Sequence, residues 1–117
     1  MGKQFDVIFL EEVLEYLKSI EKKHSEKIVY NVSKSQSKND PELFKKIADD
    51  IWEFRTLYQK LHYRLLAFWD KTDSENTLVI ATNGFIKKQS KVAKNEIKRA
   101  ISLREKYFVE KEKRNKL

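Results

Sequence analysis

Three extended segments between residues 51 and 86 constrain the fold of this chain more than any other feature. The first, IWEFRTLY, alternates in polarity, and the side that carries Trp52 and Phe54 is expected to face the core. The second, LHYRLLAFWD, is nearly apolar at its far end, as in a central strand covered on both faces. The third, TLVIATNGFI, follows the polar segment KTDSEN, which predicts a hairpin turn. Together the segments predict an antiparallel meander of three strands.

Strand and helix patterns also precede the meander. An apolar run at residues 5–10 predicts a strand, and a stripe that continues to Ile20 predicts a helix. Ser25 is expected to cap a second helix, EKIVYNVSKSQ, whose Val29 lies on its inner face, before the polar loop SKSQSKND. Asp40 followed by Pro41 is a strong helix-start signal, which predicts a short helix through PELFKKIA.

The segment after the meander predicts one long helix. Its expected inner stripe contains Ile97, Ala100, Ile101 and Phe108, and lysines and arginines cover the rest. The whole order predicts an α+β fold with a small antiparallel sheet, made of the meander and the N-terminal strand. The first two helices, expected to form an antiparallel hairpin, and the C-terminal helix are expected to pack on one face of this sheet. With 117 residues, the chain is expected to form one domain, 1–117.

Composition excludes several classes of protein. The chain has no cysteine, which excludes disulfides, a cysteine-based zinc site and a cysteine nucleophile. No run approaches 18 apolar residues, and the N-terminus lacks the apolar region of a signal peptide. We therefore expect a soluble, cytoplasmic protein with no membrane partner.

Positive charge is concentrated in the last third of the chain. Residues 84–117 carry 12 Lys and Arg against 4 Asp and Glu, a net charge of +8. Because the total is 25 basic and 18 acidic residues, residues 1–83 keep 13 and 14, a net charge of −1. A basic region on a neutral scaffold predicts an anionic partner, nucleic acid first and an acidic protein second. A solvated lysine-rich helix that keeps the protein soluble is the alternative.

Several cations are placed where the strands can bring them together. Arg55 and Arg64 lie on neighbouring strands, and Lys87 and Lys88 follow directly after the last strand. Guanidinium groups bind phosphate through two hydrogen bonds, and ammonium groups act as compact charges, so this set suits a phosphodiester. In the alternative, Glu53 pairs with Arg55 and the lysines are solvated. Four further basic residues are candidate RNA contacts: Lys91, Lys94, Lys98 and Arg99.

Other kinds of site have little support. The chain has only two histidines and two glycines, and it contains no HExxH, GxxxxGK[ST] or GxGxxG motif. Asp49 and Asp50 with Glu53 suggest loop charges or ion-pair partners rather than a metal site. We therefore expect neither a metal nor a cofactor. Among the aromatic residues, Tyr58 and Trp69 are candidates for exposed rings that stack on a base.

Four segments, IWEFRT, HYRLLAFW, NGFIKKQSKV and NEIKRA, resemble the RelE/ParE superfamily of toxins from type II toxin–antitoxin systems. The match is best with the HigB-like, phage-derived branch and runs from about residue 51 to residue 108. The resemblance implies a RelE-like fold, an antitoxin partner, often of the helix-turn-helix type, and cleavage of mRNA on the ribosome without a metal.

The resemblance also assigns roles to residues. Arg64 matches the strand arginine that contacts the phosphate, Lys87 or Lys88 matches the basic residue after the last strand, and Arg55 matches a further arginine. We add His62 as an acid–base group, because it lies beside Arg64. The chain departs from the family pattern at Val92 and Ala93, where the branch commonly has Thr–Pro.

Two alternative functions remain open. A ParE-type toxin inhibits gyrase by protein contact and cleaves no RNA. A non-catalytic nucleic-acid-binding module would use the basic helix only to hold phosphates.

Overall fold

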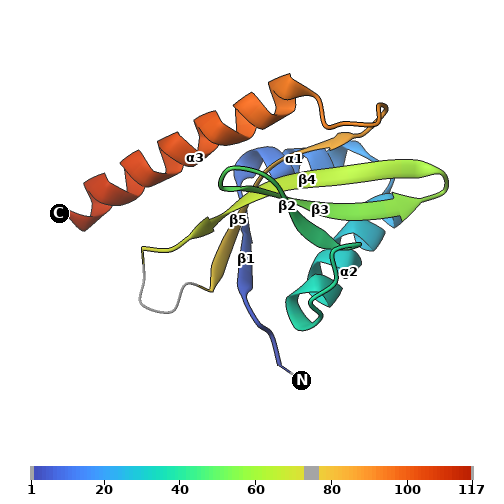
Figure 1. The fold of residues 1–117 in the computed structure, drawn as a ribbon, viewed down its shortest axis with the longest axis horizontal. Helices are drawn as coiled ribbons and strands as arrows, with labels where there is room; N and C mark the ends of the chain where they lie inside the picture. The colour runs from blue at the N-terminus through green and yellow to red at the C-terminus, as the bar shows by residue number, and fades with distance from the viewer. Residues whose placement is uncertain (1, 73–76, 117) are drawn as a thin grey trace.

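A computed structural model describes residues 2–72 and 77–116 of the chain. The elements in chain order are β1 (Asp6–Phe9), α1 (Glu11–Ser19), α2 (Lys22–Ser37), β2 (Phe44–Ala48), β3 (Ile51–Tyr58), β4 (Leu61–Asp70), β5 (Leu78–Ile86) and α3 (Lys94–Asn115) (Figure 1). The α+β class is confirmed. Of the predicted hairpin turn KTDSEN, residues 73–76 lie outside the described residues.

The five strands form one mixed sheet in the order β1-β5-β4-β3-β2. The predicted meander is confirmed, since β3, β4 and β5 pair antiparallel in sequence order. The predicted N-terminal strand is confirmed, but β1 pairs with β5 in parallel at one edge, so the sheet is mixed rather than antiparallel throughout. β4 is the central strand, as its long apolar run predicts.

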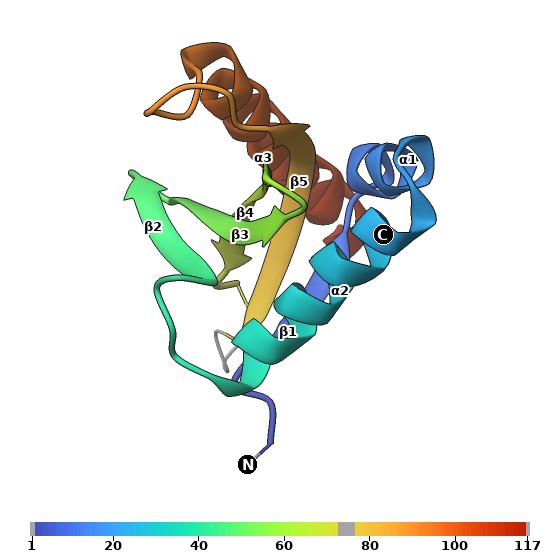
Figure 2. The same cartoon turned by 90° about the vertical axis from the view of Figure 1, so that its right-hand side faces the viewer.

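Helices cover both faces of the sheet, and the expectation that all of them lie on one face is wrong. α1 and α2 lie on one side (Figure 2), over a core that includes Val13, Ile28 and Leu65. α3 packs on the opposite side, where Ala100 contacts a second cluster with Leu66. Successive side chains of β4 point to opposite faces, and both sets are apolar in the middle of the strand, so each face needs a cover.

The segment predicted as a short helix forms the edge strand β2 instead. The helix-start signal produces a single turn, in which the Asp40 carbonyl accepts the backbone N–H groups of Leu43 and Phe44 at 2.9 and 3.1 Å. The chain then extends and pairs with β3. Phe44 stacks on Phe54 with ring centroids 4.3 Å apart. Burial of this ring against β3 outweighs the local helix signal.

Other helix details also differ from the predictions. α2 begins three residues before Ser25 and continues through Ser37, so Ser25 is not its cap and much of the predicted polar loop is helical. The Ser25 hydroxyl donates to the Leu17 carbonyl and so ties α2 to α1. Val29 and Ile101, expected on inner faces, are 42% and 40% exposed.

A two-residue turn joins β3 and β4 and is fixed from α2. Gln59 and Lys60 both have positive φ, at 49° and 68°, as a tight hairpin turn requires. His24, on α2, contacts the Gln59 Oε1 atom through Nε2 at 3.0 Å and the Tyr63 hydroxyl through Nδ1 at 2.7 Å. This contact holds the end of the hairpin against α2.

Gly84 marks the place where α1 crosses β5. A Cβ atom at this position would lie 2.7 Å from both the Leu65 side chain and the Tyr16 ring, so only glycine fits. Burial raises the pKa of Tyr16 to about 12.

Among residues 2–72 and 77–116, no helix is long and apolar enough to cross a bilayer.

Candidate nucleic-acid interface

A buried ionic triad lies on the α3 side of the sheet. Arg55 and Arg64 are direct cross-strand partners on β3 and β4. Glu53 lies between them, with its Oε2 atom 3.4 Å from the Arg55 Nε and its Oε1 atom 3.3 Å from the Arg64 Nε. The predicted convergence of the two arginines is confirmed. The Glu53–Arg55 pair of the alternative interpretation is present too.

The triad carries a net charge of +1 and is largely buried from solvent. Arg64 is 3% exposed, and one of its terminal N–H groups donates to the Tyr63 carbonyl at 2.9 Å. Burial lowers the pKa of Arg64 from its ordinary value, although the charge of Glu53 opposes this. Arg55 keeps a side-chain exposure of 25%. The triad therefore offers solvent one guanidinium, backed by a second buried charge.

The contacts inside the triad are ionic rather than well-formed hydrogen bonds. Within the described part of the chain, the Nε atoms of both arginines and the Oε1 atom of Glu53 are buried without a hydrogen bond. Buried charges are costly when their hydrogen bonds are incomplete. An anion that reached the open side of Arg55 would add the opposite charge that this pair of guanidinium groups lacks.

His62 and Lys87 extend the same face toward the ends of β4 and β5. His62 is two residues before Arg64, so it points to the same side of the sheet. It is exposed, and its carbonyl accepts the backbone N–H of Lys87 at 2.7 Å. The two residues therefore lie next to each other, His62 on β4 and Lys87 directly after β5, close to the triad.

A small hollow with three lysines follows directly after β5. Lys87, Lys88 and Lys91 line a cavity of about 120 Å³ together with Phe85, Ile86 and Glu96. Lys88 and Lys91 are exposed. Three ammonium groups against the one carboxylate of Glu96 leave the hollow with an excess of positive charge, which favours a polyanion.

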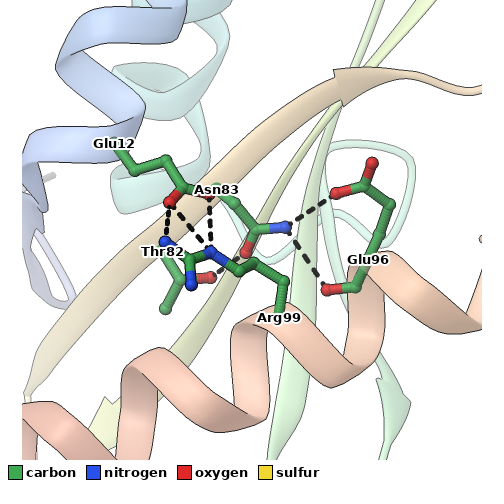
Figure 3. A network of polar contacts seen from close by, with 5 residues as sticks. All are labelled: Glu12, Thr82, Asn83, Glu96 and Arg99. Carbon is green, nitrogen blue, oxygen red and sulfur yellow. Dashed lines mark hydrogen bonds and ion pairs between the residues drawn. The ribbon is translucent and has the colours of Figure 1, made fainter.

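A polar network fixes the start of α3 beside this hollow (Figure 3). The Asn83 amide on β5 donates to the Glu96 carboxylate at 3.1 Å and to the Glu96 carbonyl at 3.3 Å. The Thr82 hydroxyl donates to the Asn83 side-chain oxygen at 2.6 Å. This network holds α3 at a fixed distance from β5, and the sequence interpretation did not anticipate it.

The candidate RNA contacts on α3 differ in their surroundings. Lys94 and Lys98 are exposed. Arg99 donates from Nε to both carboxylate oxygens of Glu12, at 2.9 and 3.3 Å, and its terminal nitrogen pairs with the same group. Arg99 thus joins α3 to α1 (Figure 3). The roles of these residues in RNA binding stay predictions.

Part of the triad could have been predicted from residue spacing. Glu53 shares its strand face with Arg55, so a carboxylate between the two arginines was within reach of residue spacing. Its near-complete burial between the two guanidinium groups could not be predicted from spacing alone.

A family model described as Phage derived protein Gp49-like (DUF891) matches residues 15–105, a range that contains every candidate site residue. The chain belongs to the Gp49-like family. No curated protein and no solved structure matches it.

The Gp49-like family is toxin-like and of the RelE/HigB type, although the matching model is not the RelE or ParE model itself. The match agrees with the resemblance drawn from the four sequence segments. Membership in the family is compatible with a toxin of a toxin–antitoxin system and suggests an antitoxin as partner.

Proposed function

We propose that this Gp49-like protein is the toxin of a type II toxin–antitoxin system and that it cleaves mRNA on the ribosome without a metal. The observation that supports the proposal best is the shared face of Arg55, Arg64, His62 and Lys87. An antitoxin, of the helix-turn-helix type in our proposal, would neutralise the toxin.

The proposed reaction is attack of an RNA 2′-hydroxyl on its own 3′-phosphate. The oxygen–phosphorus bond to the 2′-oxygen forms, the bond to the 5′-oxygen of the next nucleotide breaks, and negative charge grows on the phosphorane. Arg55 and Lys87 would stabilise that charge directly, since both have exposed surface. Arg64 and Glu53 would hold Arg55 in place. His62 would carry the proton that leaves the 2′-hydroxyl to the departing 5′-oxygen, so that the products are a 2′,3′-cyclic phosphate and a 5′-hydroxyl.

The lysines that follow β5 would hold the strand around the reacting phosphate. Lys88 and Lys91 lie beside Lys87 around one hollow, and Lys94 and Lys98 continue the positive surface along α3. Contacts of this kind bind phosphates without selecting a sequence. Arg99 would act through its pair with Glu12, by fixing α3.

The proposal is tested by measuring how strongly variants that lack these cations inhibit growth and cleave mRNA. Lys87→Ala with Lys88→Ala, and separately Arg55→Ala, should reduce cleavage by about 100-fold each, because each removes a cation that stabilises the transition state. Lys18→Ala with Lys34→Ala removes two exposed lysines on α1 and α2 and is the matched control. Circular dichroism establishes that each variant is folded, and primer extension maps mRNA ends after induction.

Three outcomes would contradict the proposal. Folded variants as toxic as the parent would exclude the assigned site. DNA-damage signalling without mRNA cleavage would support the ParE-type alternative. Salt-sensitive RNA binding with no toxicity would support the non-catalytic alternative.

A further inference from the structure

A second, larger cleft lies at the far end of the sheet from the lysine hollow. It has a volume of about 530 Å³ and is enclosed by the β2–β3 hairpin, the end of β4 and the C-terminal half of α3. Its lining combines three cations with three aromatic rings: Lys46, Lys71 and Arg104 with Trp52, Trp69 and Phe108. None of these residues belongs to the site proposed above.

The cations of this cleft exceed its acidic groups. Asp50 is the carboxylate in the lining, and it lies 3.9 Å from the Arg104 terminal nitrogen. Arg104 is also held over the Phe108 ring at 5.2 Å. Lys46 and Lys71 are exposed. The cleft therefore keeps a net charge of +2, and its arginine is fixed in place by an aromatic ring and a carboxylate.

The two tryptophans give the cleft a rigid aromatic wall. Their ring centroids are 5.9 Å apart with an interplanar angle of 74°. Phe44 stacks on Trp52 at 4.9 Å and 28°, so it supports that ring from one side. Rings held in this way offer a π-surface at little entropic cost, and bases of any sequence stack on such surfaces.

The cleft is far enough from the lysine hollow to hold a different part of the same strand. Trp69 is seven residues beyond His62 on β4. At 3.3 Å per residue, this separation is about 23 Å along the sheet. Several nucleotides of extended single strand would connect the two places.

We propose that this cleft binds an unpaired nucleotide of single-stranded RNA, with the base against Trp52 or Trp69 and the phosphate on Lys46, Lys71 and Arg104. The identity of the strand as RNA rests on the function proposed above. The combination of excess positive charge with a supported aromatic wall fits a nucleotide, which brings a flat base and an anion together.

Tryptophan fluorescence tests this site directly, since the chain contains two tryptophans and both line the cleft. The probe is a 2′-O-methyl RNA of about ten nucleotides, which lacks the attacking hydroxyl and is titrated without ribosomes. We expect quenching by this probe and about 10-fold weaker binding of an abasic strand of equal length. A DNA strand of the same sequence shows whether the site distinguishes the sugar.

Variants test whether the fluorescence quenching arises from binding in the cleft. Lys46→Ala with Lys71→Ala should weaken binding of the probe and lower the slope of log affinity against log salt by about 0.7, as expected when one phosphate of a single strand loses its lysine contacts. Lys18→Ala with Lys34→Ala, which removes the same charge elsewhere, should leave half or more of the affinity. Lys87→Ala with Lys88→Ala should bind the probe more weakly but still give full quenching at saturation, while toxicity falls.

Equal quenching by the abasic strand, or an unchanged salt slope in the Lys46/Lys71 variant, would overturn the inference. Quenching by the antitoxin but not by the probe would assign the cleft to a protein partner and would overturn it too. Quenching in a protein that cleaves no mRNA would instead contradict only the proposed function.

Discussion

The two faces of the sheet bury different kinds of side chain. Under α1 and α2, the core consists of rings and aliphatic groups such as Phe5, Phe54 and Leu65. Under α3, the apolar cluster is smaller, and Glu53, Arg64 and Asp70 are buried beside it. The comparison shows that one face of this sheet supplies most of the apolar burial, while the other holds charges in fixed positions.

The charged face gains order from paired groups rather than from close apolar packing. Asp70 is 1% exposed, and its carboxylate accepts from the Tyr107 hydroxyl at 2.6 Å and from the Lys111 ammonium at 2.6 Å. Contacts of this kind stabilise α3 only while every partner remains. The apolar face is held instead by contacts among rings and aliphatic groups, which makes the contrast testable.

The largest expected effect is on the apolar face. Phe54→Ala removes a ring that is 3% exposed and stacked on Phe44, so the free energy of unfolding should fall by about 4 kcal/mol. Urea denaturation at low and high salt measures the loss, which should be independent of salt. Leu57→Ala, on the opposite face of the same strand and 59% exposed, is the control. An equal cost for both variants would contradict the assignment of faces.

A slightly smaller effect is expected for the ionic triad. Glu53→Gln leaves two arginines facing each other and should cost about 3 kcal/mol in thermal or urea unfolding. Replacing all three members, Glu53→Met with Arg55→Leu and Arg64→Met, should recover most of that stability, since buried ion pairs are often replaceable by apolar groups. Under the proposed function the triple variant is folded but not toxic. A triple variant as unstable as Glu53→Gln would show that the charges themselves stabilise the fold.

The smallest of the three effects concerns Asp70 and depends on pH. Burial alone would raise the pKa of Asp70, but hydrogen bonds from Lys111, Thr72 and Tyr107 outweigh it and hold the pKa well below the ordinary value. A lowered pKa in the folded state stabilises the protein above the unfolded pKa of about 4, and this contribution is lost as the pH falls through the folded value. Asp70→Asn should therefore cost about 2 kcal/mol at pH 7 and progressively less toward pH 3.

Melting temperatures of the parent and Asp70→Asn between pH 7 and pH 3 measure this convergence. Asp49→Asn, which changes an exposed carboxylate, is the control. A difference between the parent and Asp70→Asn that does not change across this range would show that the carboxylate charge is not what stabilises α3.

Strand and helix patterns in the sequence predict most of this fold, because their periodicity matches the final burial. β3, β4, β5 and α3 are each recognisable in this way. β2 was missed because LFKKIA fits one apolar helix stripe as well as it fits an edge strand. Its outcome depends on the stacking of Phe44 on Phe54 across the β2–β3 hairpin, a tertiary contact that the residue spacing within this segment does not encode.

The candidate site is predictable to a smaller degree. Alternation along β3 and β4 places Arg55 and Arg64 together, and the end of β5 locates Lys87. The cleft around Trp52 and Trp69 was missed because its lining comes from β2, β3, β4 and α3, which spacing along one strand cannot combine. Of the three rings that line this cleft, the sequence pattern predicts only Trp69 as an exposed ring.

The position of β2 at one edge of the sheet has a consequence for how copies of this protein meet. An edge strand presents unpaired N–H and C=O groups, which act as a template for intermolecular β-pairing. β2 carries the exposed side chains of Lys45 and Lys46 at consecutive positions, one on each face of the strand, and the register of its pairing shifts after Lys46. Charge repulsion and an irregular edge both oppose aggregation, so Lys46 protects the sheet at the same place where it lines the aromatic cleft.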